Sequence, residues 1–567
     1  MDIEFVTVFG GIAIALIAAF VNGMLRKRKL KQAFMESVLK KYGQFAESRN
    51  YKESDRERIA SYHIKQVELG KTEFELDDIT WNDLSMDAVF DTLNTTVSSI
   101  GEEYLYHMLR CPKMQPDEMH DFDSLVDLFD EHEEVRMKVM VILHEIGRLT
   151  HFSLTRILYS MCDLECRSNL PHYFMNAFLI VGFCTIFISP GIGTLLLIAA
   201  LSLSIITYFK YKSEVYTYYT SFHYVLRMLS GIRDMEKMKA EALADDVRRM
   251  VEIRKLFAAF MSQQFLFSDG VHTTSNPLEL LMDYLRLLFH ADIIKFNSML
   301  KCLQGHIDEI EELRAIYGRF DAAIAVASYR NALEVSCRPV FMDESIVCIK
   351  IEDGYHPLIK EAVKNSIEAS GGVLLTGSNA SGKSTFLKMV AICAIFAQTI
   401  GIVPAKQYAA SRFRIYSSMA LRDNLATSES YFIVEIKSLK RIVDATQEDQ
   451  TPILCFVDEI LRGTNTIERI AASSQILKGL ITSRVICFGA THDIELAGIL
   501  ADYYENYHFE EELEKETVRF PFILLKGKAT TKNAIKLLGI LGYDKEIVKS
   551  AEKSASYFEQ TQEWETL

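Results

Sequence analysis

The chain has little proline and no excess of positive charge. Its 567 residues include 10 prolines, and 49% of them are hydrophobic, which excludes a disordered or low-complexity protein. Lys and Arg number 62 against 76 Asp and Glu, so the formal net charge is −14. A globally basic nucleic-acid-binding protein is therefore not expected, although a local basic face is compatible with this balance.

Cysteine is too scarce for a disulfide framework, with 10 residues in the whole chain. Several cysteines stand inside apolar runs and are expected to be buried in a reducing compartment: Cys184, Cys393, Cys455 and Cys487. Cys162 and Cys166 are one helical turn apart and could hold a metal ion. Because no second Cys or His pair stands nearby at zinc spacing, we expect them to serve packing instead.

The first of two long apolar segments lies at the start of the chain. Residues 5–25 carry no charge, and about 20 apolar residues suffice to cross a bilayer. The basic run RKRKLK follows at Arg26, whereas a cleavable signal peptide would carry its positive charge before the apolar run. We therefore expect an uncleaved anchor over residues 1–25, with Met1 outside and a helical juxtamembrane segment over 26–75 in the cytoplasm.

The second apolar segment runs from Ser168 to Phe209 without a charged residue. It is interrupted at Ser189-Pro190-Gly191, and an uninterrupted helix of this length would be too long for a membrane. We expect a transmembrane helical hairpin over residues 173–210. A single span with a long interfacial piece and a buried soluble hairpin are the two alternatives.

Residues 30–67 and 213–330 are rich in charged residues with apolar positions at helical spacing, which predicts soluble amphipathic helices there. From about residue 346 onward, short β-rich runs such as GVLLTG and PILCFVDE alternate with helical stretches. That alternation predicts a domain with a parallel α/β sheet over residues 346–567.

A phosphate-binding loop stands in this last part. The pattern G-x-x-x-x-G-K-[ST] spans Gly377 to Ser384, with an apolar strand before it and an apolar helix after it. Its glycines let backbone N–H groups and a helix N-terminus surround phosphate oxygens. Lys383 would reach the β- and γ-phosphates, and the Ser384 hydroxyl would bind Mg²⁺.

Two more strands end in candidate catalytic residues. The strand ILCFV ends in Asp458, which would complete the Mg²⁺ shell, and Glu459, which would orient or deprotonate the attacking water. The strand VICFGAT is followed by His492, which could contact the γ-phosphate or the water.

The order of the runs TGSNASGKST, DNLATSESYFIVEI, FVDEILRGTNT and FGATHDIEL resembles the ATPase domain of the MutS family of DNA mismatch-repair proteins, within the ABC class of ATPases. The resemblance extends over about residues 76–160 and 213–555 and is most specific in 354–495. It implies an α/β P-loop (ABC-type) ATPase domain over residues 346–567 and a long all-α lever and core domain in two parts, 76–172 and 211–345. The apolar segments would add N-terminal and internal transmembrane helices. It also implies ATP and Mg²⁺ as cofactors.

The resemblance implies roles for single residues. Nucleotide contacts would come from the loop residues Gly377, Ser378, Asn379, Ala380, Ser381, Gly382, Lys383, Ser384 and Thr385. Ser430 would contact the nucleotide of a second subunit, and the loop Arg462-Gly463-Thr464-Asn465 would cross the interface of a homodimer. Metal ligands would be Ser384 and Asp458, and Glu459 and His492 would be catalytic.

The chain also departs from that family. Because only about 75 residues precede the helical region, we expect no mismatch-reading domain, and we expect no nuclease domain after Leu567. No aromatic residue stands between Leu358 and Ser370, where the family usually has an adenine-stacking ring. Adenine selectivity is therefore not predicted from the sequence.

Two classes of function remain. The first is a multi-pass cell-membrane protein with a cytoplasmic ATPase dimer whose arms clamp double-stranded DNA; Arg248, Arg249, Arg254 and Lys255 are the candidate phosphate contacts. The second is an ABC-type mechanochemical ATPase that acts on a membrane or on a protein partner, without nucleic acid. A transporter is a weaker third class, because three spans per subunit make a poor pore.

Overall fold

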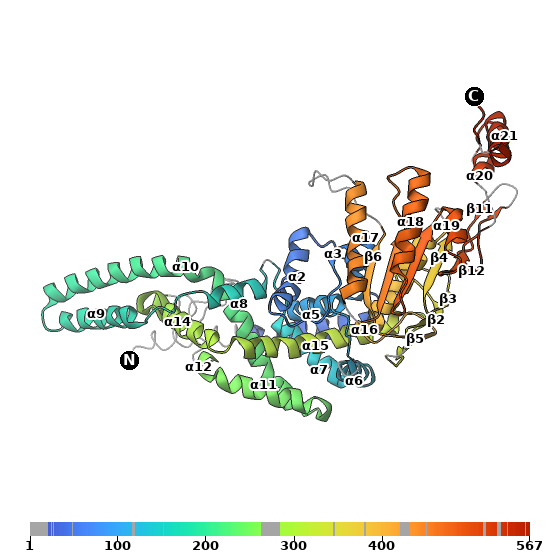
Figure 1. Ribbon diagram of the computed structural model, residues 1–567. Helices are drawn as coiled ribbons and strands as arrows, with labels where there is room; N and C mark the ends of the chain where they lie inside the picture. Colours follow the sequence, from blue (N-terminus) through green and yellow to red (C-terminus); the bar gives the residue numbers. More distant parts are fainter. Residues whose placement is uncertain are drawn as a thin grey trace.

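The computed structural model describes residues 21–567 except 24, 27, 48, 116–118, 151, 262–283, 344–345, 379–380, 420–430, 449–450, 514–517, 530–533, 541, 562 and 567. The molecule is elongated (Figure 1). A helical hairpin projects from one end, a helical core fills the middle, and an α/β domain lies at the other end. Most of the predicted anchor over residues 1–25 lies outside the described residues.

The first part of the chain is helical. Residues 28–41 form a helix, and the following elements are α2 (Glu53–Glu68), α3 (Asp78–Asp83), α4 (Met86–Leu93), α5 (Ser99–Arg110), α6 (His120–Glu131), α7 (Glu133–Ile146), α8 (Leu154–Cys162), α9 (Leu170–Ile186), α10 (Pro190–Met238), η2 (Glu241–Leu243), α11 (Ala244–Leu256), α12 (Ala258–Met261), α14 (Ala291–Gln304) and α15 (Ile307–Ala332).

Helix α15 is the central element of the helical core and packs along α5. Two buried polar contacts fix the register of this pair. The Asp321 carboxylate on α15 accepts hydrogen bonds from the backbone N–H and hydroxyl of Ser98, the N-cap of α5, at 2.9 and 2.5 Å. Arg314 on α15 forms a buried ion pair with Glu103 on α5. Since an unpaired buried charge is costly, these pairs specify one alignment of the two helices.

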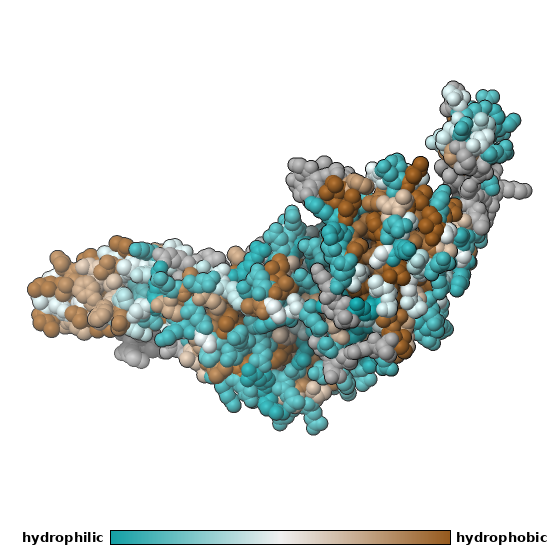
Figure 2. Space-filling model, in the orientation of Figure 1, coloured by the Kyte–Doolittle hydropathy of each residue, from teal (hydrophilic) through white to brown (hydrophobic). Residues whose placement is uncertain are grey.

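Helices α9 and α10 form the projecting hairpin, which turns at Ser189-Pro190 as the sequence predicts. The two helices approach so closely at Gly193 that a Cβ there would lie 2.3 Å from the Ile186 nitrogen. Figure 2 shows hydrophobic atoms concentrated on this hairpin. Its exposed large apolar side chains include Phe174, Ile180, Phe183, Phe187, Ile188, Leu195, Ile198 and Ile206.

The hairpin does not end at residue 210. Helix α10 is 49 residues long in total and runs to Met238, because no proline interrupts it after its first turn. Among the described residues, one segment, Pro190–Ser213, is long and apolar enough to cross a membrane by length and composition. The partner helix Leu170–Ile186 is apolar but shorter.

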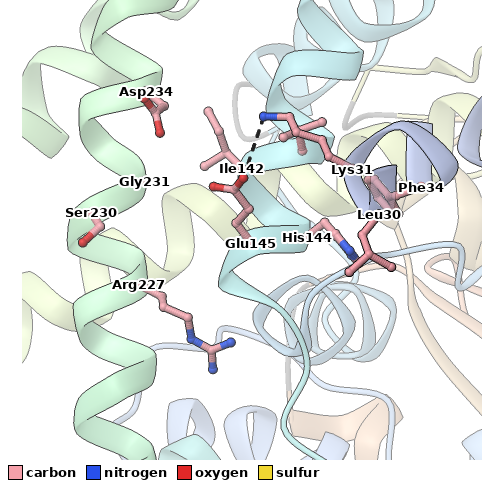
Figure 3. Close-up of a pocket in the computed structure, with 11 residues that line it drawn as sticks. Leu30, Lys31, Phe34, Ile142, His144, Glu145, Arg227, Ser230, Gly231 and Asp234 are labelled. Atoms are coloured by element: carbon pink, nitrogen blue, oxygen red, sulfur yellow. Dashed lines mark ion pairs between the residues drawn. The ribbon is translucent and has the colours of Figure 1, made fainter. Parts of the chain in front are cut away.

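The helix of residues 28–41 packs against α7 and α10. The Phe34 ring stacks on His144 of α7 with 3.7 Å between ring centroids, and Lys31 Nζ lies 3.7 Å from Glu145 Oε1. A cavity of about 420 Å³ lies where this helix meets α7 and α10, lined on the α10 side by Arg227 and Asp234 (Figure 3). These contacts hold the segment of residues 28–41 on the helical core.

The α/β domain contains two main sheets. The larger has the strand order β12-β9-β4-β8-β7-β6, in which only β12 is antiparallel to its neighbour; the smaller has the order β1-β5-β2-β3. The strands are β1 (Val340–Phe341), β2 (Ile349–Gly354), β3 (Asn365–Ala369), β4 (Gly372–Thr376), β5 (Gln407–Ala410), β6 (Arg414–Ser418), β7 (Ile453–Asp458), β8 (Val485–Thr491), β9 (Tyr504–His508), β10 (Glu512–Leu513), β11 (Val518–Arg519) and β12 (Leu525–Lys526).

Strands β4, β7 and β8 are buried along their whole length, which explains their continuous apolar sequences. The helices of this domain are α16 (Lys383–Thr399), α17 (Tyr431–Glu448), α18 (Thr466–Leu480), α19 (Ile494–Ile499), α20 (Ala534–Ile540) and α21 (Lys545–Thr561). The predicted combination of an α/β domain with a large helical region is confirmed.

Helix α3 connects the helical core to the sheet. The buried Asp83 carboxylate accepts hydrogen bonds from the Ser417 hydroxyl and the Met419 N–H, both at 2.8 Å, and the Thr80 hydroxyl accepts one from the Ser417 N–H at 3.1 Å. Ser417 belongs to β6, which is the direct neighbour of β7. These hydrogen bonds therefore join the edge of the sheet directly to the helical core.

Candidate functional site

Three neighbouring parallel strands end at one edge of the larger sheet. In the register of the sheet, Thr376 of β4 pairs with Thr491 of β8, and Asp458 of β7 pairs with Ala490 of β8. The residues that follow these strands therefore meet, although about 75 and 110 positions separate them from the phosphate loop in sequence. The structure thus brings the described loop residues, 377–378 and 381–385, together with Asp458, Glu459 and His492 at one edge.

The loop depends on two glycines with positive φ. Gly377 has φ +144°, and a Cβ there would lie 2.8 Å from the Phe509 carbonyl oxygen; Gly382 has φ +101°. Lys383, in the first turn of α16, donates hydrogen bonds to the carbonyl oxygens of Gly377 and Ser378 at 2.8 and 2.7 Å. The ammonium group is thus held over the loop.

Other members of the predicted loop set are placed as follows. The Ser381 hydroxyl donates to the Ser378 carbonyl oxygen at 2.7 Å, and the Ser378 hydroxyl donates to the Glu511 carboxylate at 3.2 Å. Thr385 lines a neighbouring cavity. Asn379, Ala380 and Ser430 lie outside the described residues.

Ser384 and Asp458 are in direct contact. The Ser384 hydroxyl donates to Asp458 Oδ2 at 2.5 Å, while Asp458 Oδ1 is buried and makes no hydrogen bond. Burial raises the pKa of the Asp458 carboxyl above its usual range. A buried carboxylate oxygen without a donor, next to a serine hydroxyl, is a donor set that suits Mg²⁺.

Glu459 stands directly after β7 in a left-handed conformation with φ +54°. Its backbone N–H donates to the Ala490 carbonyl oxygen at 2.8 Å, which anchors the residue to β8. Its carboxylate pairs with Arg462 and lies 3.6 Å from Nδ1 of His492, whose side chain is 43% exposed. Burial lowers the pKa of the Lys383 ammonium, and the negative charges of Glu459 and Asp458 offset only part of this effect.

Two positioning contacts were not predicted from the sequence. The buried Glu435 carboxylate on α17 accepts a hydrogen bond from the backbone N–H of Leu461, two residues after Glu459. Arg469 on α18 forms a two-pronged ion pair with Asp493, at 2.8 and 2.7 Å, beside His492. Glu435 belongs to the run SESYFIVEI, but only the tertiary structure places it under the loop that carries Glu459.

A cavity of about 370 Å³ adjoins the phosphate loop and is lined by the rings of His356, Phe386, Phe509 and Phe522. A Cβ at Gly382 would lie 2.9 Å from the Phe522 ring. The Asn365 side chain of β3 holds this ring in place, because it donates to the Phe522 carbonyl oxygen at 2.9 Å and accepts from the Leu524 N–H at 2.8 Å. An aromatic-lined cavity beside a phosphate loop suits a flat heterocyclic base. The sequence window 358–370 contains no such ring, and Phe522 comes from a distant segment.

The predicted interface loop contacts its own subunit. Arg462 pairs with Glu459, and the Asn465 side chain caps α18 by accepting a hydrogen bond from the Glu468 N–H at 3.0 Å. Next to this loop, Ile467 of α18 is 83% exposed, and Ile433 and Ile436 of α17 are also exposed. Figure 2 shows hydrophobic atoms over these two helices.

The candidate DNA contacts on α11 are interleaved with acidic groups. Arg248 pairs with Asp245, and Arg249 forms hydrogen bonds with Glu312 at 2.7 Å and with Glu252 at 3.1 Å. This helix therefore presents a mixed rather than a basic surface.

The part of the chain that carries the site is similar to known proteins. Residues 373–559 match the family model for MutS domain V. The chain is 30% identical over 267 residues to human MutS protein homolog 4, covering 44% of this chain and 28% of that protein. It is 32% identical over 251 residues to the DNA mismatch repair protein MutS of Thermus aquaticus, covering 43% of this chain and 30% of that protein. The match thus spans less than a third of the length of either relative.

Proposed function

We propose that this chain is a MutS-family ATPase that hydrolyses ATP to ADP and phosphate. The observation that carries the proposal is the contact of Ser384 with Asp458, whose second oxygen is buried without a donor, inside the segment that matches MutS domain V. In this assignment, Ser384 and Asp458 would hold Mg²⁺, which would supply positive charge to neutralise the phosphate oxygens. The aromatic cavity of Phe522 receives the adenine.

The residues around Ser384 and Asp458 bind the phosphates, accept the proton and position the catalytic groups. Lys383 exchanges its contacts with loop carbonyls for the β- and γ-phosphates. Glu459 accepts a proton from the attacking water, whose oxygen bonds to the γ-phosphorus as the bond to the β-phosphate bridging oxygen breaks. His492, at the end of β8, contacts the γ-phosphate or the same water. The carboxylate of Glu435 keeps the loop after Glu459 in place.

We further propose that the ATPase works as a homodimer. The exposed apolar side chains of α17 and α18 lie next to the loop Arg462 to Asn465, and they would be buried by a second subunit. In such a dimer, Ser430 would reach the partner's nucleotide. Closure on ATP would then move the helical core through the hydrogen bonds between β6 and α3.

We propose that the α9–α10 hairpin inserts into a membrane, with the ATPase domain in the cytoplasm. The exposed apolar side chains of the hairpin and the basic run after residue 25 support this arrangement. We expect the chain to stay in the membrane fraction after washing with alkaline carbonate. A chain shortened by residues 1–25 should behave in the same way. Release of the shortened chain into the supernatant would contradict insertion of the hairpin.

The two candidate functions differ in what the moving helical arms act on. The name of the Thermus aquaticus relative, DNA mismatch repair protein MutS, supports clamping of double-stranded DNA by the helical arms. The net charge of −14 and the acidic partners of Arg248 and Arg249 favour the second function, a mechanochemical ATPase acting on a membrane or protein partner. We place DNA clamping first, because the domain match is to MutS.

Titration with DNA separates the two functions. The detergent-solubilised protein, with and without ATP, is mixed with matched and mismatched duplexes at two salt concentrations. DNA clamping predicts ATP-responsive binding that weakens several-fold at the higher salt, since phosphate contacts release counterions. Replacing Arg254 and Lys255 by glutamate should weaken that binding, whereas the same change at Lys545 and Lys549 of α21 should not. Absence of salt-dependent binding would decide for the second function.

A further inference from the structure

Three potential metal ligands converge in the helical core, far from the nucleotide site in sequence. His63 lies on α2, His107 lies on the last turn of α5, and Cys111 follows the end of α5 just before Pro112. Their ligand atoms lie within 4.8 Å of one another. His63 and Cys111 are 5% and 6% exposed. From these residues we infer that the chain binds a structural zinc-class divalent metal ion here.

The distances fit coordination by one ion. Nδ1 of His63 and Nδ1 of His107 are 3.2 Å apart, and Sγ of Cys111 is 3.7 Å from each of them. A triangle with these sides has its centre about 2.1 Å from each corner, and Zn²⁺ binds imidazole nitrogen at about 2.0–2.1 Å and thiolate sulfur at about 2.3 Å. Two nitrogens and one sulfur are also the ligand types that zinc and cobalt prefer.

A carboxylate orients one of the ligands from outside the cluster. Nε2 of His63 lies 3.1 Å from the carboxylate of Glu75. A proton on Nε2 donated to Glu75 leaves the lone pair on Nδ1, the atom that faces the cluster. A metal-bound histidine usually donates its other ring N–H to a group such as a carboxylate in this way.

The place of the cluster in the fold indicates what the ion would do. The cluster joins α2 to the end of α5. Two residues after Cys111, the Lys113 N–H donates to the Gln398 carbonyl oxygen at 2.7 Å. Gln398 lies in the last turn of α16, the helix that begins at the phosphate loop. The ion therefore fixes the helical core where it meets the ATPase domain, and its binding does not depend on the proposed ATPase activity.

Metal analysis and cobalt substitution test the site on the full chain in detergent. We expect about one zinc per chain after dialysis against zinc and then against buffer. Replacement by Co²⁺ should produce a thiolate-to-cobalt charge-transfer band in the near ultraviolet. Cys111→Ser should remove that band, whereas Cys166→Ser, at an exposed cysteine, should keep it. Glu75→Gln should keep the band and weaken metal affinity by about 10- to 100-fold.

Two results would overturn the inference. One is a full-length protein that retains no zinc and shows no charge-transfer band with Co²⁺; the two histidines would then form a simple hydrogen bond in the core. The other is a band that survives in Cys111→Ser. Far-ultraviolet circular dichroism of both cysteine variants verifies that each is folded, and the isosteric Glu75→Gln variant gives a second reading that does not remove a ligand.

Discussion

Lys383→Ala is expected to reduce the affinity for Mg·ATP by about 100- to 1000-fold. Removal of one partner from a desolvated charge pair costs about 3–4 kcal/mol, and each 1.4 kcal/mol is a factor of ten in affinity. Lys383 is the buried cation that already donates to the carbonyl oxygens of Gly377 and Ser378. Isothermal titration calorimetry with ATP and Mg²⁺ measures the loss.

The matched control is Lys478→Ala on α18, which removes an exposed lysine from the same domain. Its side chain lies over the Tyr503 ring and does not contact the phosphate loop. The control should bind ATP like the parent protein. Unchanged binding in Lys383→Ala would exclude the loop as the nucleotide site.

Phe522→Ala in the same assay should weaken binding by about tenfold, because base stacking on one ring is worth about 1–3 kcal/mol.

Glu459→Gln is expected to bind ATP but to lower kcat by about 100- to 10,000-fold. Glutamine keeps the size of the side chain but cannot accept a proton from water, and general-base catalysis contributes about that factor. The buried position of Glu459 after β7, anchored by its N–H to the Ala490 carbonyl oxygen, should keep the backbone in place in the variant. Phosphate release at saturating ATP measures kcat.

The same variant tests the dimer. If ATP closes two subunits, Glu459→Gln should accumulate as an ATP-bound dimer, which size-exclusion chromatography with light scattering detects. Glu495→Gln, on α19 beyond the edge of the sheet, is the control and should turn over normally. Normal turnover in Glu459→Gln would remove this carboxylate from catalysis, while lost turnover without dimer accumulation would contradict closure on ATP.

Much of the nucleotide site could be predicted because its parts are local in sequence. A glycine-rich turn, a lysine and a serine in one short run form a phosphate loop wherever a strand precedes them and a helix follows. Asp458 and His492 could be assigned to the same edge because buried parallel strands place their carboxyl ends together. The helical hairpin was also predictable, since a long charge-free run that is interrupted at Ser189-Pro190 favours two helices joined by a turn. The continuation of α10 to Met238 was not predicted, because the boundary was placed at residue 210, where the charge-free run ends.

The other groups depend on packing between distant segments. Glu435 meets Leu461 through the contact of α17 with the loop after β7, and Phe522 reaches the phosphate loop because Asn365 holds its backbone. The spacing of Cys162 and Cys166 would allow a metal ion, but no ion was expected there, and Cys166 contacts the side chain of Gln304. The ligand cluster forms at His63, His107 and Cys111, which no short motif connects.

By itself, the amino-acid sequence determined the α/β class of the C-terminal part, the phosphate loop with its two acidic residues, and the apolar hairpin. Each of these follows from residues within one strand, turn or helix, where backbone sterics and hydrophobic periodicity act over a few positions. Only the tertiary structure decided which ring lines the cavity beside the phosphate loop, which carboxylate accepts the Leu461 N–H, and where His63, His107 and Cys111 meet. Those choices depend on the register of α2 on α5 and of one sheet on another, and that register is set by the packing of the whole core.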